Sequence, residues 1–150
     1  MIKVQGDWPL EFQNQIVRLI VVANGKDWYS GSQPSLLKLK RTGRGNCVAW
    51  SKLIIEIATS YGLQTIEINI ADRSEKKSKM DRHMFCIIID TDQTIWYQSC
   101  RDLTKFIKFR GKLSNKKRLA IVKRIARIVG ERAGYAGGTK VISFSYKHQQ

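Results

Sequence analysis

Residues 42–62, TGRGNCVAWSKLIIEIATSYG, are the stretch that decides how the rest of the chain folds. Apolar side chains recur there at steps of three and four residues, which is the spacing of one buried stripe on an α-helix. Asn46 is a favourable N-cap residue, and Gly62 follows the last apolar position, where many helices end. The sequence therefore predicts a helix that begins near Cys47 and packs this stripe against a core.

Cys47 is the main chemical feature of this stretch. The backbone N–H groups at a helix N-terminus are unpaired and carry a partial positive charge, which favours a thiolate there. Gly43 and Gly45 leave room for the backbone of a substrate to approach. A cysteine on an apolar helix is more often inert core than nucleophile, but Cys47 precedes the apolar stripe instead of lying in it. We therefore predict that Cys47 is a nucleophile.

Helical and strand patterns continue on both sides of this stretch. Before it, a helix is predicted to end at about residue 23, and a long irregular loop follows over residues 26–44. After it, alternating apolar residues predict strands at residues 64–70, 82–90, 94–100 and 139–146. A charged loop at residues 72–81 and a helix of about fifteen residues after Ser114 or Asn115 complete the order. We expect one α+β domain over residues 1–150, with helices packed on a small antiparallel sheet.

Composition limits the class of protein. Hydrophobic residues make up 43% of the chain and charged residues 26%, which is ordinary for a globular domain. The three cysteines form no CxxC pair and no Cys/His cluster at zinc spacing, so we expect no disulfide framework, metal or other cofactor, and a reducing compartment. The longest apolar stretch, residues 16–23, is too short for a membrane span and contains Arg18. These features predict a protein of the cytoplasm, or of a virus particle assembled there, without membrane attachment.

The charge of the chain is far from balanced. It has 27 Lys and Arg against 12 Asp and Glu, a net charge of +15. Residues 101–132 hold twelve of the basic residues and two acidic ones, so this segment alone carries +10. A solvated helix face usually mixes both signs of charge, so we predict that this segment contacts a polyanion, either non-specific nucleic acid or an acidic protein. The helical residues predicted to make the contact are Lys116, Lys117, Arg118, Lys123, Arg124 and Arg127.

His83 is the candidate partner for the thiol. It begins the predicted strand 82–90 and shares a face with Phe85, Ile87 and Ile89. The other histidine, His148, lies near the C-terminus and is interpreted as a tail residue. A structural, hydrogen-bonded histidine is the ordinary alternative, but the presence of Cys47 favours a catalytic role for His83.

The order of these features resembles the transglutaminase-like branch of the papain-type cysteine hydrolases. The resemblance is carried by residues 43–70, GRGNCVAWSKLIIEIATSYGLQTIEINI, and by residues 82–97, RHMFCIIIDTDQTIWY. Upstream, Trp28 and Tyr29 are similar to the aromatic residues that precede the loop in bacterial transglutaminase-like cysteine peptidases. The resemblance as a whole covers residues 12–100. It implies a papain-like core, to which the basic helix and the final strand are added.

The resemblance also implies a reaction. Cys47 would attack a carbonyl of a protein or peptide substrate, His83 would take its proton, and the Cys47 N–H would stabilise the oxyanion. The implied activity is that of a thiol-dependent hydrolase or acyltransferase acting on protein amide bonds, as a peptidase, deamidase or transglutaminase-type enzyme.

The third catalytic residue departs from the family pattern. In the family an acid stands four residues after the tryptophan of the Trp-Tyr strand, and here that position is Cys100, a poor hydrogen-bond acceptor. Gln98 and Asp102 are the other candidates. The alternative function is an inactive papain-like scaffold that serves as a basic, nucleic-acid- or protein-binding structural protein. A component of a virus particle or a host-directed inhibitor would suit its size and charge.

Overall fold

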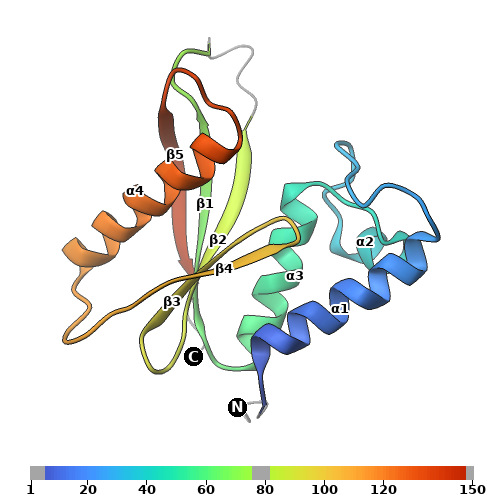
Figure 1. Cartoon of the computed structure of the whole chain (residues 1–150), viewed down its shortest axis with the longest axis horizontal. Coiled ribbons are helices and arrows are strands. Elements are labelled where there is room, and N and C mark those ends of the chain that lie inside the picture. The colour runs from blue at the N-terminus through green and yellow to red at the C-terminus, as the bar shows by residue number, and fades with distance from the viewer. Residues whose placement is uncertain (1–5, 76–81, 148–150) are drawn as a thin grey trace.

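The computed structural model describes residues 6–75 and 82–147 (Figure 1). Within them the chain forms four helices and one five-stranded antiparallel sheet, which confirms the predicted α+β class. In chain order the elements are α1 (Trp8–Ala23), α2 (Leu36–Thr42), α3 (Cys47–Ser60), β1 (Gln64–Asp72), β2 (His83–Ile89), β3 (Thr94–Ser99), β4 (Asp102–Lys108), α4 (Asn115–Arg132) and β5 (Thr139–Lys147). Part of the predicted charged loop, residues 76–81, and His148 lie outside the described residues.

The helix after Asn46 begins as predicted. The side-chain Oδ1 of Asn46 accepts hydrogen bonds from the N–H groups of Val48, at 3.0 Å, and Ala49, at 3.3 Å. These bonds satisfy two of the donors that a helix N-terminus leaves unpaired. Gly62, with φ of 74°, turns the chain into β1. The first turn of α3 is therefore held by side-chain capping, and Cys47 is its first residue.

Two elements were not predicted. α2 lies inside the segment expected to be loop, capped by Ser35 and ended by Gly43 with φ of 71°. It has seven residues and buries only Leu39 completely, so it is too short to show a helical period. β4 was also missed, because it is an edge strand with half-buried or exposed side chains along its whole length.

The sheet has the strand order β4-β3-β2-β1-β5. The last strand therefore pairs with the first one, and β5 forms one edge of the sheet while β4 forms the other. On the face that α4 covers, Ile68 pairs with Phe85 of β2 on one side and with Phe144 of β5 on the other. This register aligns β5 beside α4.

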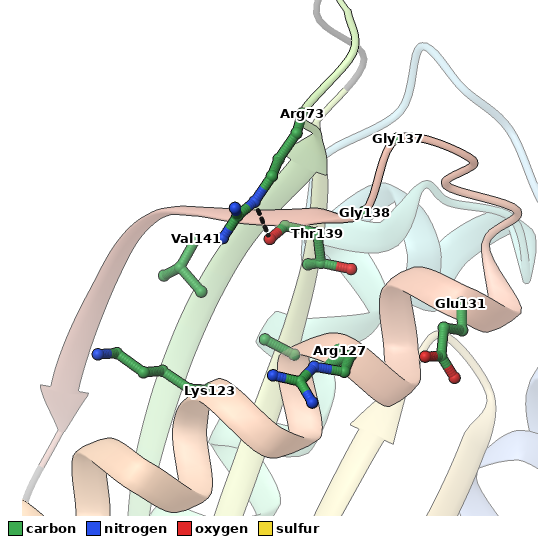
Figure 2. A pocket seen from close by; sticks show the side chains of 9 residues that line it. Arg73, Lys123, Arg127, Glu131, Gly137, Gly138, Thr139 and Val141 are labelled. Carbon is green, nitrogen blue, oxygen red and sulfur yellow. Dashed lines mark hydrogen bonds between the residues drawn. The ribbon is translucent and has the colours of Figure 1, made fainter.

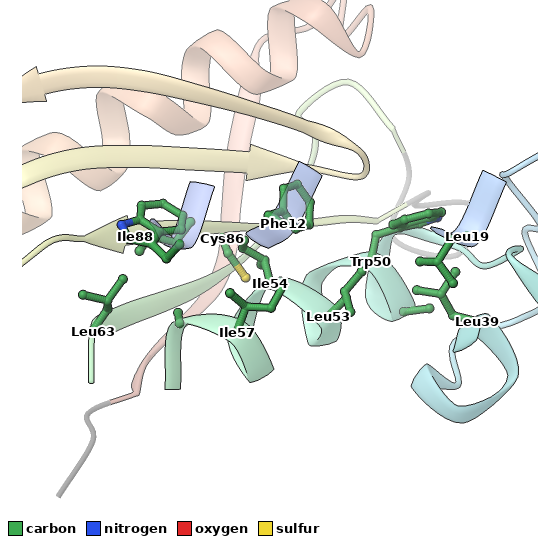
Figure 3. Close-up of a cluster of buried hydrophobic side chains, with 13 residues drawn as sticks. Phe12, Leu19, Leu39, Trp50, Leu53, Ile54, Ile57, Leu63, Cys86 and Ile88 are labelled. Atoms are coloured by element: carbon green, nitrogen blue, oxygen red, sulfur yellow. The ribbon is translucent and has the colours of Figure 1, made fainter. Parts of the chain in front are cut away.

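Helices cover both faces of the sheet, with α1, α2 and α3 on one face and α4 on the other (Figure 1). Figure 3 shows the first core, where Phe12, Trp50 and Ile54 pack with Cys86 and Ile88 of β2. The second core lies on the other face of the sheet, where the alternate residues of the strands pack against α4. It comprises Ile66, Ile68, Ile70, Phe85, Ile87, Ile89, Ile95, Tyr97, Leu113, Val122, Ile125, Ala126 and Val129. Because β2 is buried on both faces, its sequence is a nearly continuous apolar run.

Candidate functional site

Cys47 lies where the N-terminus of α3 meets β2. Its Sγ accepts a hydrogen bond from the backbone N–H of Met84 at 3.4 Å. The residue is 8% exposed, so the sulfur is buried between the helix and the sheet. The structure thus brings Cys47 to the strand that contains His83, as the sequence predicts. The sulfur, however, contacts the backbone of Met84 and not the side chain of His83.

His83 projects from the other face of the sheet. Its Nε2 lies 2.8 Å from the Oγ of Ser99 on β3. Together with Tyr97, Asp102 and Arg132, these residues line a pocket of about 210 Å³ beside the C-terminal end of α4. His83 also pairs in register with Ile70, whose side chain belongs to the core under α4.

The predicted Cys47–His83 pair is therefore not assembled. Successive residues of a strand point to opposite faces, so a ring that shares a face with Phe85 and Ile87 is directed toward α4. α3 packs on the opposite face, with Cys86 and Ile88. In the part of the chain that the structure describes, no hydrogen bond joins the Cys47 thiol to the imidazole. Burial of Cys47 also limits the access of a substrate to its sulfur.

The three candidates for a third catalytic residue are divided between the two faces. Gln98 is fully buried, pairs in register with Cys86 and donates from Nε2 to the carbonyl of Cys100 at 2.7 Å. It therefore lies on the α3 face, away from the imidazole. Cys100 packs against the same core, and burial, followed by the neighbouring Cys47, raises the pKa of its thiol to about 12. Only Asp102 lines the pocket of His83, and its side chain is exposed.

The basic helix carries its charges on the solvent side, as predicted. Five of the six residues predicted to bind a polyanion are exposed, and they are Lys116, Lys117, Lys123, Arg124 and Arg127. Arg118 is half-buried and donates to the Oε1 of Gln64 at 3.1 Å. The apolar stripe of α4 is occupied by the core, which leaves the cations along its two flanks.

On the flank next to β4, the cations lie over aromatic rings. Lys117 is 5.1 Å from the centroid of Phe109, Arg124 is 5.6 Å from Phe106, and Arg132 is 5.8 Å from Tyr97. Such contacts stabilise a cation by the ring quadrupole and bury its aliphatic stem. This flank is therefore a row of cations with fixed positions.

On the flank next to β5, cations from two segments line one pocket (Figure 2). The pocket has a volume of about 530 Å³ and is bounded by Lys123 and Arg127 of α4, by Arg73 and by residues 137–139. Figure 2 shows Arg73 across the pocket from the two helical side chains, with Glu131 near the C-terminal end of the helix. The sequence prediction missed Arg73, because it follows β1 and precedes α4 by about forty residues.

Arg73 is held in this position by main-chain contacts. Its Nε donates to the carbonyl of Thr139 at 3.0 Å, and its backbone N–H donates to the carbonyl of Gly138, also at 3.0 Å. The adjacent Asp72 accepts from the N–H groups of Ser74, at 2.9 Å, and Gly137, at 3.1 Å. Hydrogen bonds from Ser74, first from its backbone and then from its hydroxyl, lower the pKa of Asp72. The Asp72 carboxylate thus links the end of β1 to Gly137, in the loop before β5, by a hydrogen bond.

The pocket cations form no ion pair with an acidic residue among the described residues. In residues 6–75 and 82–147 the ion pairs are Lys40–Glu56, Lys108–Asp92 and Lys147–Glu67, and none of them involves a residue of this pocket. Three cations line this pocket against one acidic residue, Glu131, so the cations repel one another and a bound anion relieves this repulsion. Arg73, Lys123 and Arg127 therefore form a site with a strong preference for anions.

Comparison with protein-family models, with curated proteins and with solved structures gave no match to this chain. Among the described residues, none of the helices is both long and apolar enough to cross a bilayer.

Proposed function

We propose that this protein binds nucleic acid without sequence specificity, through the cations that α4 presents to solvent. The observation that carries the proposal is the convergence of Arg73, Lys123 and Arg127 on one pocket, where none of the three forms an ion pair with another described residue. Phosphate contacts need cations that are fixed and unpaired.

The distribution of charge along α4 supports a long polyanion over a single small anion. The helix has eighteen residues, which corresponds to a length of roughly 27 Å. Cations line both of its flanks, some over aromatic rings and some around the pocket beside β5. A chain of phosphates can contact several of these positions at once, and each contact releases a counterion.

We further propose that the domain is a papain-like, transglutaminase-like scaffold whose thiol site is inactive. The Cys47 helix, its position against β2 and the strand order that follows support this proposal. The backbone N–H of Met84 donates a hydrogen bond to the Cys47 sulfur. A catalytic cysteine would instead need an imidazole next to its sulfur. Thiol-dependent hydrolysis of protein amide bonds stays a prediction from sequence. A structural role in a virus particle or as a host-directed inhibitor agrees with a small, basic binding protein.

Binding of a fluorescent, mixed-sequence DNA oligonucleotide, followed by anisotropy, tests the proposed function. We expect the affinity to fall roughly tenfold to a hundredfold between about 50 and about 200 mM salt, because the release of counterions at about three phosphate contacts becomes less favourable as the salt concentration rises. The double variant Lys123→Glu, Arg127→Glu should bind much more weakly than the wild type.

The matched control is the double variant Lys26→Glu, Lys38→Glu, which changes the net charge by the same amount on exposed residues at the α1 and α2 side. It should keep nearly all of the affinity. Equal losses in the two variants, or binding that does not respond to salt, would exclude a nucleic-acid surface on α4.

A further inference from the structure

Two aromatic side chains are exposed next to the basic helix. Phe144 is 40% exposed and Tyr146 is 37% exposed, and both belong to the edge strand β5. Their rings are edge to face, with centroids 5.7 Å apart and an interplanar angle of 89°. In register they pair with Ile68 and Ile66, so they lie on the face of the sheet that α4 covers. Exposed aromatic rings at a charged surface are typical of binding sites.

These rings line a second pocket between α4 and β5. It has a volume of about 360 Å³, and its helical side is formed by Asn115, Arg118 and Leu119. Arg118 brings a guanidinium to this end, and its Nε is buried without a hydrogen-bond partner among the described residues. The aromatic pocket therefore also contains a cation, which the bond to Gln64 holds in place.

The aromatic pocket and the cationic pocket of Figure 2 follow one another between α4 and β5, and we call the two together the groove. Both lie between the same two elements, with Val141 of β5 at the cationic end and Phe144 at the aromatic end. Figure 1 shows α4 on one face of the sheet, running obliquely to β5, with the C-terminal end of the helix near the start of the strand. A strand of nine residues spans roughly 30 Å, which is comparable to the length of the helix. The groove is long enough for several nucleotides.

The combination of rings and cations distinguishes among polyanions. The bases of a duplex are stacked on one another and are not available to a protein ring, whereas each unpaired base can stack on an aromatic side chain. A lipid surface would need an apolar helix face, and the apolar stripe of α4 is buried in the core. Charge complementarity therefore favours a polyanion, and the exposed rings favour a single strand among polyanions.

We infer that the groove between α4 and β5 binds single-stranded nucleic acid. Unpaired bases stack on Phe144 and Tyr146, while Arg73, Lys123 and Arg127 contact the phosphates. This inference rests on the proposed function, because it specifies which nucleic acid the basic surface accepts.

The test compares a fluorescent twelve-nucleotide thymidine strand with a duplex of the same length, at one salt concentration. The variant Phe144→Ala, Tyr146→Ala should lose roughly 25-fold or more of its affinity for the single strand, because each of the two lost stacking contacts weakens binding by about fivefold or more. Its affinity for the duplex should stay within twofold. Tyr29→Ala removes a ring of similar exposure, 43%, outside the groove and should change neither affinity.

A second measurement uses the wild-type protein and does not depend on a variant that folds. A single strand that contains 5-bromouracil is crosslinked by light, and the attached peptide is found by mass spectrometry. We expect the crosslink in residues 139–147. Crosslinks confined to other segments would overturn the inference, even if the alanine variant were unfolded.

The outcomes separate the groove from the basic surface as a whole. If the wild type binds neither strand form in dilute buffer, both the proposed function and the groove are wrong. If it binds both forms equally and the aromatic variant loses nothing, the groove is wrong and the basic surface remains. If the β5 edge instead pairs with a second copy, the wild type will be a dimer, the aromatic variant a monomer, and single-strand affinity unchanged, which also overturns the inference.

Discussion

At the scale of single residues, the three thiols have different surroundings. Burial, and next the charge of Glu67, raise the pKa of Cys86, and burial raises the pKa of Cys100 to about 12. At pH 8 the thiol of Cys100 is therefore almost entirely protonated. Cys47 alone has its sulfur at a helix N-terminus, where it accepts a backbone hydrogen bond. The rate at which Cys47 reacts with an alkylating reagent therefore shows whether the thiol site is active or inactive.

Alkylation with iodoacetamide measures this difference. In the folded protein at pH 8 we expect Cys86 and Cys100 to stay unlabelled, because the pKa of each thiol is raised, and Cys47 to react slowly because it is 8% exposed. His83→Ala should leave the rate at Cys47 unchanged, because the ring lies on the other face of the sheet. Mass spectrometry of each cysteine peptide gives the rates. Rapid labelling of Cys47 that His83→Ala selectively slows would restore the hydrolase interpretation.

At the scale of elements, the contact between β1, α4 and β5 decides where the cations of the groove stand. Gly130 of α4 lies so close to the side chain of Thr139 that an added Cβ would overlap it. The loop between them returns to Asp72, which accepts the N–H of Gly137. Arg73, next in the chain, therefore owes its place to this junction and to its own bonds with Gly138 and Thr139.

Asp72→Asn tests the junction and gives a pH dependence of known sign. The folded-state pKa of Asp72 is lowered below its ordinary 3.8, so its stabilising contribution is present above about pH 4. The contribution is lost as the pH falls through the lower, folded-state value. The wild type should therefore unfold at a higher temperature than the variant at pH 6, and the difference should shrink by pH 3. A difference that does not depend on pH would contradict an ionised Asp72 in the folded state.

At the scale of the whole molecule, the sheet separates two cores with different roles. Helices α1 to α3 bury the Cys47 side and include the segment for which we propose a papain-like scaffold. α4 and β5 bury the other side and supply the groove. Because β1 pairs with both β2 and β5, the two halves share one sheet and fold together.

Removal of residues 110–150 tests this interdependence. The shortened chain would expose the α4 face of the sheet, including Ile66, Phe85 and Ile87, and would leave β1 as an edge strand. We expect it to aggregate, or to lose cooperative thermal unfolding as measured by circular dichroism. A soluble fragment with a sharp unfolding transition would instead mean that the hydrolase-like half is an independent domain.

The sequence by itself determined the elements with strong local signals. The Asn46 cap and the spacing of the apolar stripe define α3, and alternation defines β1 and β2, because these patterns depend on neighbouring residues. The excess of positive charge on α4 was also visible, since its apolar stripe had to face the core. α2 and β4 escaped prediction because one is a single short helix and the other an exposed edge strand.

Only the tertiary structure decided which residues meet. Periodicity tells which side chains of β2 share a face, but not which helix covers that face, and so it could not separate His83 from Cys47. The groove depends on the pairing of β5 with β1, a contact between residues about seventy positions apart. Arg73 and Phe144 come beside α4 through this pairing alone. Strand order is a property of long-range contacts, and for that reason no local pattern encodes it.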